Sequence, residues 1–519
     1  MRPHREPFLL RAVVATMPMV ATAVFAMLSS AALLATAAAF QIKASVSIPR
    51  MSHLTDDGVI NQHEGRDETI SRLVAEKLKR IVAGYQTHGD EMKRTLETEL
   101  ELSNRVEKCF FGGAHPHVGN LLFSSKLVVK QRLLEESLEV NGQVVRQLLA
   151  TPDGGKQLFE SIDFVPSAAV QGNGEHDDLG QLLGNGGMIK VGEEAKEIEG
   201  YDTALQVIHH TSRDWTTGSA PCREKTIGWI VSVIKEYAGA RAQLRVLVPG
   251  AGLMRLAFDI STCRDLVEEG EVLVEANDSS VTMAFAAQQV LQMLQQRHKQ
   301  QNQLQSTILP FLSDPRINEV DITKRFEKYM FPDCEALNCY ERYYEVKGAE
   351  PNLSFTVGDF VSTYSQEAKR SQYDVIATSF FIDTATNIYE YVFIMKHLLD
   401  SDAQSPSIWI NCGPVQWHPC ALLRPTVEEL KCILEAAGFE LLSWQVAEEA
   451  VAYKHPDEIG GSGMKPRYTR SEAYRPLQFA ARLKIGVGVD ADENDSAHLP
   501  LKVQYSEHLN EVANGRVKA

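Results

Sequence analysis

The strongest constraint on the fold is a regular alternation of short apolar segments and amphipathic helical segments after residue 200. Seven apolar segments read as strands, at 245–248, 271–276, 354–357, 373–382, 407–411, 440–445 and 477–485. Such β-α alternation predicts a mostly parallel sheet with helices on both faces. The last two strands have no obvious helix between them, which predicts an antiparallel pair at one sheet edge. One α/β domain is therefore expected over residues 201–490.

The preceding region, residues 46–200, is expected to be helical with a Gly-rich linker. Apolar residues recur at three- and four-residue steps over 67–108, and a second helical stretch runs near 133–149. Residues 164–187 are rich in Gly, Asn and Asp and predict a loop or linker. A polar tail follows the α/β domain at 491–519.

The N-terminal segment 1–45 differs in composition from the rest of the chain. Residues 12–42 carry no charge and follow Arg2, Arg5 and Arg11. The segment is long enough to span a bilayer and ends in an alanine run that resembles a cleavage site. A signal anchor, a cleaved targeting peptide and a mispredicted start all remain open. Because Phe40 after the alanines resembles plastid-type import sequences of algae, we favour organelle import over membrane anchoring through 12–42.

Charge and cysteine usage exclude several classes of protein. The 519 residues carry 52 Lys and Arg against 68 Asp and Glu, a net charge of −16, which argues against a nucleic-acid-binding protein. Eight dispersed cysteines without a CxxC pair indicate a reduced, intracellular chain. The spacing of Cys334 and Cys339 is only a weak indication of zinc, so no metal is expected.

A glycine turn carries the clearest local signal for a ligand. The strand 246–248 leads into Gly250 and Gly252 and then a helix, so the backbone can turn sharply and approach a ligand. The third glycine of a dinucleotide fingerprint is replaced by Arg255, which leaves the NAD pattern incomplete. A tight turn without a ligand is the alternative. An acid for ribose hydroxyls should follow the next strand, where Glu275 and Asp278 both fit.

Further candidates follow the later strands. In 357–360 an Asp and an aromatic residue could contact an adenine, although this motif alone favours an ordinary turn at the end of a strand. Asp383 ends the apolar stretch 373–382 and would point into the crevice at the carboxyl edge of the sheet. The alternative is that Asp383 caps the helix predicted at 387–399. The loop after the next strand brings Trp417 and His418 to the same edge.

Several motifs together resemble the carnosine N-methyltransferase family of S-adenosylmethionine (SAM)-dependent enzymes. They are SRDWT at 212–216, VPGAGLMRLAFDI, VGDF, YDVIATSFFIDTATNIYEY and WINCGPVQWHP. The resemblance covers about residues 200–485, with a weaker similarity from about 65 to 160. It implies a class I, Rossmann-like methyltransferase fold with a seven-stranded, mostly parallel sheet and a helical N-terminal region. It also implies methyl transfer from SAM to an imidazole nitrogen of a histidine-containing dipeptide, carnosine to anserine.

The resemblance assigns a role to each matching residue. The SAM contacts would be His210, Arg213, Gly250, Gly252, Asp278, Asp359, Phe360 and Val375. The family usually has Gln, Glu and Cys where this chain has His210, Asp278 and Val375. The acceptor contacts would be Asp383, His418, Tyr453 and Tyr474, of which Asp383, His418 and Tyr474 are the catalytic candidates. Tyr468 is a rival to Tyr474.

The expected chemistry and its alternatives follow from these roles. Asp383 would accept one imidazole N–H, fix the tautomer and stabilise the imidazolium that forms. The acceptor could instead be a protein histidine or another small histidine compound. A nicotinamide or flavin oxidoreductase, or a binding protein that has lost catalysis, are rival functions. The family also suggests a homodimer through the helical region and a cytoplasmic and nuclear location.

Overall fold

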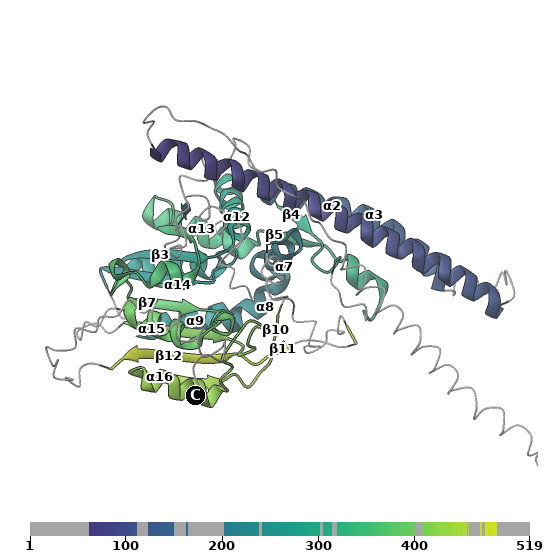
Figure 1. The fold of residues 1–519 in the computed structure, drawn as a ribbon. Coiled ribbons are helices and arrows are strands. Elements are labelled where there is room, and N and C mark those ends of the chain that lie inside the picture. The colour runs from purple at the N-terminus through teal and green to yellow at the C-terminus, as the bar shows by residue number, and fades with distance from the viewer. Residues whose placement is uncertain are drawn as a thin grey trace, which may run out of the picture. The chain divides into compact units, whose positions relative to one another are not determined.

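The computed structural model describes residues 62–111, 123–149, 162–164, 202–237, 241–300, 305–313, 319–399, 407–453, 455, 468–469 and 473–484 (Figure 1). The chain divides into two units, residues 1–62 and 63–519, and the sheet and its helices belong to the second. The predicted targeting segment at 1–45, the loop from 165 to 187 and the polar tail at 491–519 lie outside the described residues.

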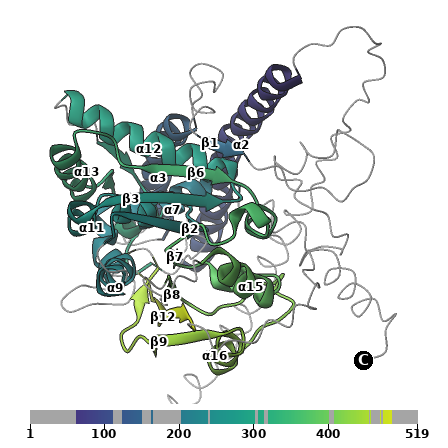
Figure 2. The same cartoon turned by 90° about the vertical axis from the view of Figure 1, so that its left-hand side faces the viewer.

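An eight-stranded sheet forms the centre of the second unit, in the order β1-β6-β3-β2-β7-β8-β12-β9 (Figure 2). Neighbouring strands are parallel, except that β12 is antiparallel to both β8 and β9. The strands are β1 (Ile162–Phe164), β2 (Gln243–Pro249), β3 (Glu271–Asp278), β6 (Leu353–Val357), β7 (Val375–Thr378), β8 (Ile408–Gly413), β9 (Phe439–Val446) and β12 (Leu477–Leu483).

The seven predicted strands and the antiparallel edge pair are confirmed, and with them the α/β fold expected of a class I methyltransferase. Two details differ from the prediction. The added strand β1 pairs with β6 at the far edge of the sheet and begins just before the predicted loop. The strand predicted at 373–382 ends at Thr378, because Phe380 takes a left-handed φ of +53° and a 3-10 turn, η6 (Ile382–Thr384), follows.

Helices cover both faces of the sheet, as the alternation predicts. Val246 and Val248 of β2 face one apolar core and Leu247 faces the other. The first core is closed by α9 (Trp229–Tyr237), α10 (Arg255–Ser261), α11 (Arg264–Glu269), α12 (Val281–Gln300) and α13 (Cys334–Lys347). The second is closed by α14 (Phe360–Tyr364), α15 (Ile388–Leu398) and α16 (Val427–Ala436).

Short elements connect these layers. They are α7 (Ala204–Trp215), η2 (Thr217–Ser219), α8 (Ala220–Arg223), the π-helical turn η3 (Glu224–Gly228), β4 (Ser306–Ile308), η4 (Ile322–Phe326), β5 (Tyr329–Phe331), η5 (Glu367–Lys369), β10 (Val451–Ala452) and β11 (Ala473–Tyr474). β4 pairs with β5, and β10 with β11, both antiparallel.

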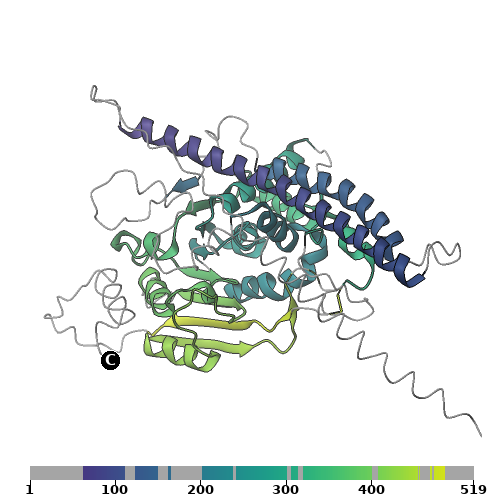
Figure 3. The same cartoon turned by 45° about the vertical axis from the view of Figure 1, so that its right-hand side comes forward.

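Two long helices form the N-terminal part of the unit. Helix α2 (Gln62–Phe111) and helix α3 (Phe123–Leu148) lie side by side across the α/β part (Figures 1 and 3). Val74 and Leu78 of α2 are buried in the first core. Asn141 of α3 exchanges two hydrogen bonds with the backbone of Leu309, at 2.9 and 2.8 Å. The expected helical N-terminal region is therefore present and joined to the α/β part. No helix among the described residues has the length and apolar character needed to cross a membrane.

Helix boundaries test two sequence interpretations. The capping box of α16 is formed by Thr426 and Glu429, and Gly438 follows with φ +97°. The cap of α15 is Asn387, whose side chain accepts the Tyr389 N–H at 3.1 Å. The alternative that Asp383 caps this helix is therefore wrong, because Asp383 lies in η6, before the capping position.

Candidate functional site

The glycine turn lies at the carboxyl end of β2, and its backbone requires glycine. Gly250 and Gly252 have φ of +63° and +51°. A Cβ added to Gly250 would lie 2.4 Å from Cδ2 of Phe381, so any side chain there would displace that ring. The N–H of Gly252 donates to Oδ2 of Asp278 at 2.9 Å. Asp278, at the end of β3, therefore holds the glycine turn in place through its hydrogen bond with Gly252.

Asp278 is buried and bonded to backbone on both sides. Its Oδ1 accepts the Ser280 N–H at 2.9 Å. Burial, and to a smaller extent the charge of Asp202, raise the pKa of Asp278 to about 6 despite these hydrogen bonds. The carboxylate is therefore ionised at neutral pH but protonates in mild acid.

Glu275, the alternative ribose acid, serves the scaffold instead. It accepts hydrogen bonds at 2.6 Å from the hydroxyls of Tyr364 and Tyr373 and at 2.8 Å from Thr356. Burial acts to raise the pKa of Glu275, but the hydrogen bonds from Tyr364, Tyr373 and Thr356 and the charge of Lys369 together outweigh it, and the pKa is lowered. Of the two candidates, Asp278 is the acid next to the glycine turn.

Arg255 replaces the third glycine of the fingerprint for a structural reason. Its guanidinium is buried and pairs with Asp333 at 2.7 Å and Asp259 at 2.8 Å, and it donates to the Asp214 carbonyl at 3.0 Å. It also lies over the Trp215 ring, 5.2 Å from the centroid. Arg255 therefore ties α10 to the end of α7 and to the start of α13.

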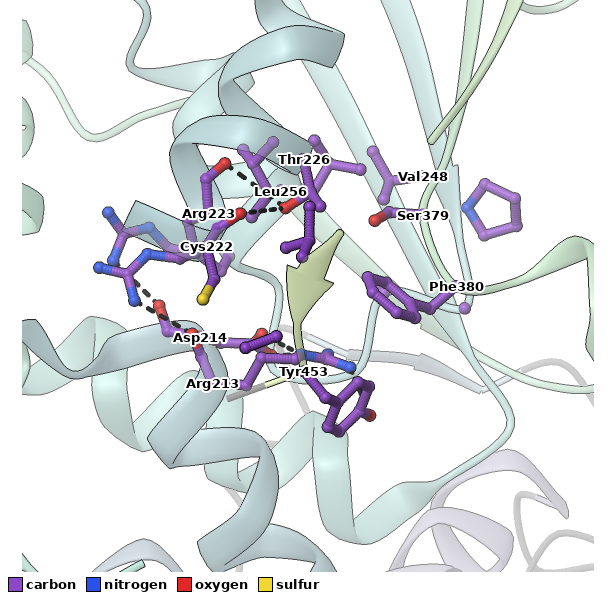
Figure 4. Close-up of a pocket in the computed structure, with 17 residues that line it drawn as sticks. Arg213, Asp214, Cys222, Arg223, Thr226, Val248, Leu256, Ser379, Phe380 and Tyr453 are labelled. Carbon is purple, nitrogen blue, oxygen red and sulfur yellow. Dashed lines mark hydrogen bonds and ion pairs between the residues drawn. The ribbon is translucent and has the colours of Figure 1, made fainter. Parts of the chain in front are cut away.

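A small pocket beside the glycine turn is lined by Phe380, Tyr453 and Arg213, among others (Figure 4). The Nε of Arg213 donates to Asp214 at 2.6 Å, and its Nη1 donates to the Tyr453 hydroxyl at 2.8 Å. Its Nη2 lies 3.1 Å from Nδ1 of His210. The guanidinium also lies 5.5 Å from the Phe380 ring centroid and 5.2 Å from that of Tyr453. Arg213 therefore contacts both His210 and Tyr453, the other two predicted residues beside the glycine turn.

The segment 379–383 connects this pocket to the rest of the carboxyl edge. The Phe380 ring meets Tyr453 at 5.4 Å and Tyr474 at 6.2 Å, edge to face. The next residue, Phe381, turns the other way and stacks on Tyr391 at 4.8 Å. Gly413 at the end of β8 permits this path, since a Cβ there would lie 2.6 Å from the Phe380 nitrogen. Sequence reasoning missed both phenylalanines, although the paired aromatics before Asp383 were a usable signal.

Asp383 joins the ends of β7 and β8. Its Oδ2 accepts the Gln416 N–H at 3.0 Å, and its backbone carbonyl accepts the His418 N–H at 3.0 Å. Burial raises the pKa of Asp383, while the Gln416 N–H and the charge of His418 act to lower it. The His418 side chain is exposed beside this carboxylate. A carboxylate accepts up to about four hydrogen bonds, so Asp383 has capacity for a ligand N–H.

The adenine candidates lie next to this segment. Asp359 is exposed and caps α14, accepting the Ser362 N–H at 2.8 Å. Phe360 is buried, with its ring edge-on to Phe381 at 5.2 Å.

Three other residues lie away from these contacts. Val375 is fully buried at the start of β7, paired with Val246 in the core, which argues against the predicted contact with SAM. Tyr468 packs against Phe311 at 6.4 Å, so Tyr474 is the tyrosine that reaches Phe380. Trp417 donates to the Pro425 carbonyl at 2.8 Å.

The described part of the chain contains no cluster of three or more His, Cys, Asp or Glu side chains that could hold a metal ion. Cys334 and Cys339 are free thiols on α13.

Comparison with known proteins gives one family. The family model described as "Carnosine N-methyltransferase" matches residues 193–458. The chain is 29% identical over 257 residues to "Carnosine N-methyltransferase" of Schizosaccharomyces pombe, covering 44% of this chain and 60% of that protein. It is 28% identical over 248 residues to the Mus musculus protein of the same name, covering 46% and 54%.

The chain therefore spans about half the length of the curated relatives that it matches. Its structure was also compared with solved structures. One that matches is described as "Crystal structure of a SAM dependent methyltransferase from Aquifex aeolicus". The TM-score is 0.27 and the sequence identity 12%, and the match covers 54% of this chain and 97% of that one.

Proposed function

The chain belongs to the carnosine N-methyltransferase family, and from that premise we propose that it transfers a methyl group from SAM to an imidazole nitrogen of carnosine, giving anserine. The observation that carries this proposal is the position of Asp383. A buried carboxylate with a raised pKa is held at the carboxyl edge, two residues after Phe381, whose ring abuts Gly250. Carboxylates placed this way orient and stabilise an imidazole that gains positive charge.

The residues at the carboxyl edge suit SAM. Left-handed glycines at 250 and 252 let the backbone approach a ligand, and Arg213 supplies a cation for its carboxylate. Asp278 and the exposed Asp359 supply acceptors for ribose hydroxyls and the adenine amine. Asp278 is one methylene shorter than the usual Glu of the family, and its two backbone hydrogen bonds hold it close to Gly252. SAM supplies a methyl group activated by a sulfonium.

The protein's own contribution is to orient the acceptor. Imidazole has a pKa near 6.5, so it is mostly neutral at pH 7 and one ring nitrogen carries a free lone pair. Asp383 would accept the N–H of the other nitrogen, which selects the tautomer and the attacking atom. The same carboxylate would stabilise the imidazolium product. His418, beside Asp383, and Tyr474, in ring contact with Phe380, would hold the peptide part of the acceptor.

Two other acceptors and one other reaction class remain as rivals. A protein histidine and other small histidine compounds would use the same carboxylate. A nicotinamide or flavin oxidoreductase is disfavoured, because the third-glycine position is filled by Arg255 and its side chain is committed to Asp333 and Asp259.

A methyl-transfer assay separates these functions. The full chain is incubated with SAM labelled in the methyl group and, in parallel, with carnosine, free histidine, or a cell extract. We expect label in carnosine and little in free histidine. Label only in proteins of the extract would favour a protein acceptor. Tight binding of NAD with no binding of SAM would contradict the proposal.

We also propose that residues 1–45 are a targeting segment that is removed after import, and that the enzyme works as a homodimer. Mass spectrometry of the mature N-terminus in its native source tests the first proposal. A mature protein that retains residues 12–42 would contradict it. Light scattering of the purified protein tests the second, and a monomer at assay concentration would contradict it.

A further inference from the structure

A series of hydrogen bonds through Ser280 connects the turn that carries Asp278 to residues outside the sheet. The Ser280 N–H donates to Asp278, and the Ser280 hydroxyl accepts the Met283 N–H at 3.1 Å, which caps the start of α12. The same hydroxyl donates its proton to Asp202. Ser280 is 2% exposed, so its hydrogen bonds to Asp278 and Met283 are shielded from water.

Asp202 connects three helices. It directly precedes Thr203, the cap of α7, and α7 carries His210 and Arg213. One Asp202 oxygen accepts the Ser280 hydroxyl at the start of α12, and the other pairs with Nζ of Lys77 on α2. The Lys77 and Asp202 side chains are each only 16% exposed. The long N-terminal helix therefore supplies the counter-charge for Asp202, which is bonded to Ser280, two residues after Asp278.

The charges in this arrangement depend on one another. Asp202 acts on Asp278 electrostatically and disfavours its ionised form, since the two carboxylates have the same sign. Lys77 compensates the Asp202 charge. Removing one partner of a mostly buried ion pair leaves an uncompensated charge, which is more damaging than removing both. Without Lys77, Asp202 would turn toward water and release Ser280.

We propose that Lys77 and Asp202 are positioning residues for SAM, holding the Asp278 turn in its binding geometry through Ser280. The inference rests on the proposed function, because it takes Asp278 as a ribose contact. Lys77 precedes residues 193–458, the part that the family model matches. The N-terminal helix would thus be part of the cofactor site and not an appendage to it.

Calorimetric titration of SAM into the folded protein, without an acceptor, tests the inference. Lys77→Met removes the charge and keeps an unbranched side chain that is one atom shorter. Lys79→Met is the matched control, because Lys79 is exposed on the same helix. We expect the Kd for SAM to rise about tenfold in Lys77→Met and to stay unchanged in the control. Lys77→Arg should retain most of the affinity, since it preserves the charge.

The double variant Lys77→Met with Asp202→Asn separates positioning from stability. The amide oxygen of Asn still accepts the Ser280 hydroxyl, and no buried charge is left unpaired. We expect its affinity to lie between those of the wild type and Lys77→Met. Wild-type affinity in folded Lys77→Met, or an affinity in the double variant no better than that of Lys77→Met, would overturn the inference. Failure of the wild type to bind SAM would overturn the proposed function and this inference with it.

Discussion

Replacing Asp383 with Asn tests the proposed role of that carboxylate with little disturbance of the fold. An Asn side chain has the same shape, and its Oδ1 can still accept the Gln416 N–H that Asp383 accepts at 3.0 Å. The helix cap is unaffected, because Asn387 caps α15.

The expected effect on stability is small. A hydrogen bond to a charged acceptor is stronger than one to a neutral acceptor by about 1 kcal/mol. Against this loss, burial raises the pKa of Asp383, so its charged form is disfavoured at neutral pH and removing the charge relieves that penalty. We expect the free energy of unfolding to change by less than about 1 kcal/mol at pH 7.

The expected effect on turnover is large. The amide of Asn donates as well as accepts, so either imidazole tautomer can bind, and the imidazolium loses its counter-charge. Loss of a comparable orienting carboxylate in a serine protease lowers kcat by about 10⁴-fold. We therefore expect a loss of at least about a hundredfold in kcat for methyl transfer, with the Kd for SAM nearly unchanged.

The assay compares Asp383→Asn with Asn387→Ala. The second variant removes the cap of α15, which should lower stability by about 1 kcal/mol and leave kcat unchanged. Wild-type kcat in Asp383→Asn would refute the catalytic role. A large loss of SAM affinity in that variant would place the residue on the donor side.

Three further changes give distinct outcomes. Gly250→Ala and Gly348→Ala both place a side chain at φ near +65°, but only the side chain at 250 meets a neighbour. Calorimetry should therefore show weakened SAM binding in Gly250→Ala alone, and equal affinities would contradict the assignment of Gly250 to the SAM site. Because burial raises the pKa of Asp278 from 3.8 to about 6, its contribution to stability is full below pH 4 and is lost as the pH rises through 6. Asp278→Asn should therefore flatten the pH dependence of the thermal unfolding temperature and should also weaken SAM binding. An unchanged pH profile would contradict the raised pKa of Asp278. Tyr474→Phe should raise KM for the acceptor severalfold and Tyr468→Phe should not, and the reverse order in steady-state kinetics would favour Tyr468.

Seven strands of the sheet and the antiparallel pair at one edge were predictable from the sequence, because they follow from the length and spacing of the apolar segments. The buried run 246–248 and the capping box at Thr426 carry their structure within a few residues. The end of β7 was not predictable, because the apolar run continues past Thr378 while the backbone reverses at Phe380. That left-handed residue is held by tertiary contacts with Tyr453 and Tyr474.

The residues of the candidate site were predicted one by one from the sequence, but the contacts that join them were not. Asp278 and Asp383 lie at the carboxyl ends of strands, where the topology of a parallel sheet places ligand contacts. Val375 was assigned by motif alone, and the pairing register puts it at the opposite end of its strand. The contact between Lys77 and Asp202 joins residues 125 positions apart, so no local pattern announces it.

The most direct test of the account is to locate the transferred methyl group. The full chain is incubated with SAM and carnosine, and the product is analysed by tandem mass spectrometry and NMR. We predict one added methyl group on an imidazole ring nitrogen, with one equivalent of S-adenosylhomocysteine formed, and a rate lower by at least about a hundredfold for Asp383→Asn. A methyl group on the amine or carboxylate of carnosine, or an Asp383→Asn enzyme that methylates the ring at the wild-type rate, would contradict it.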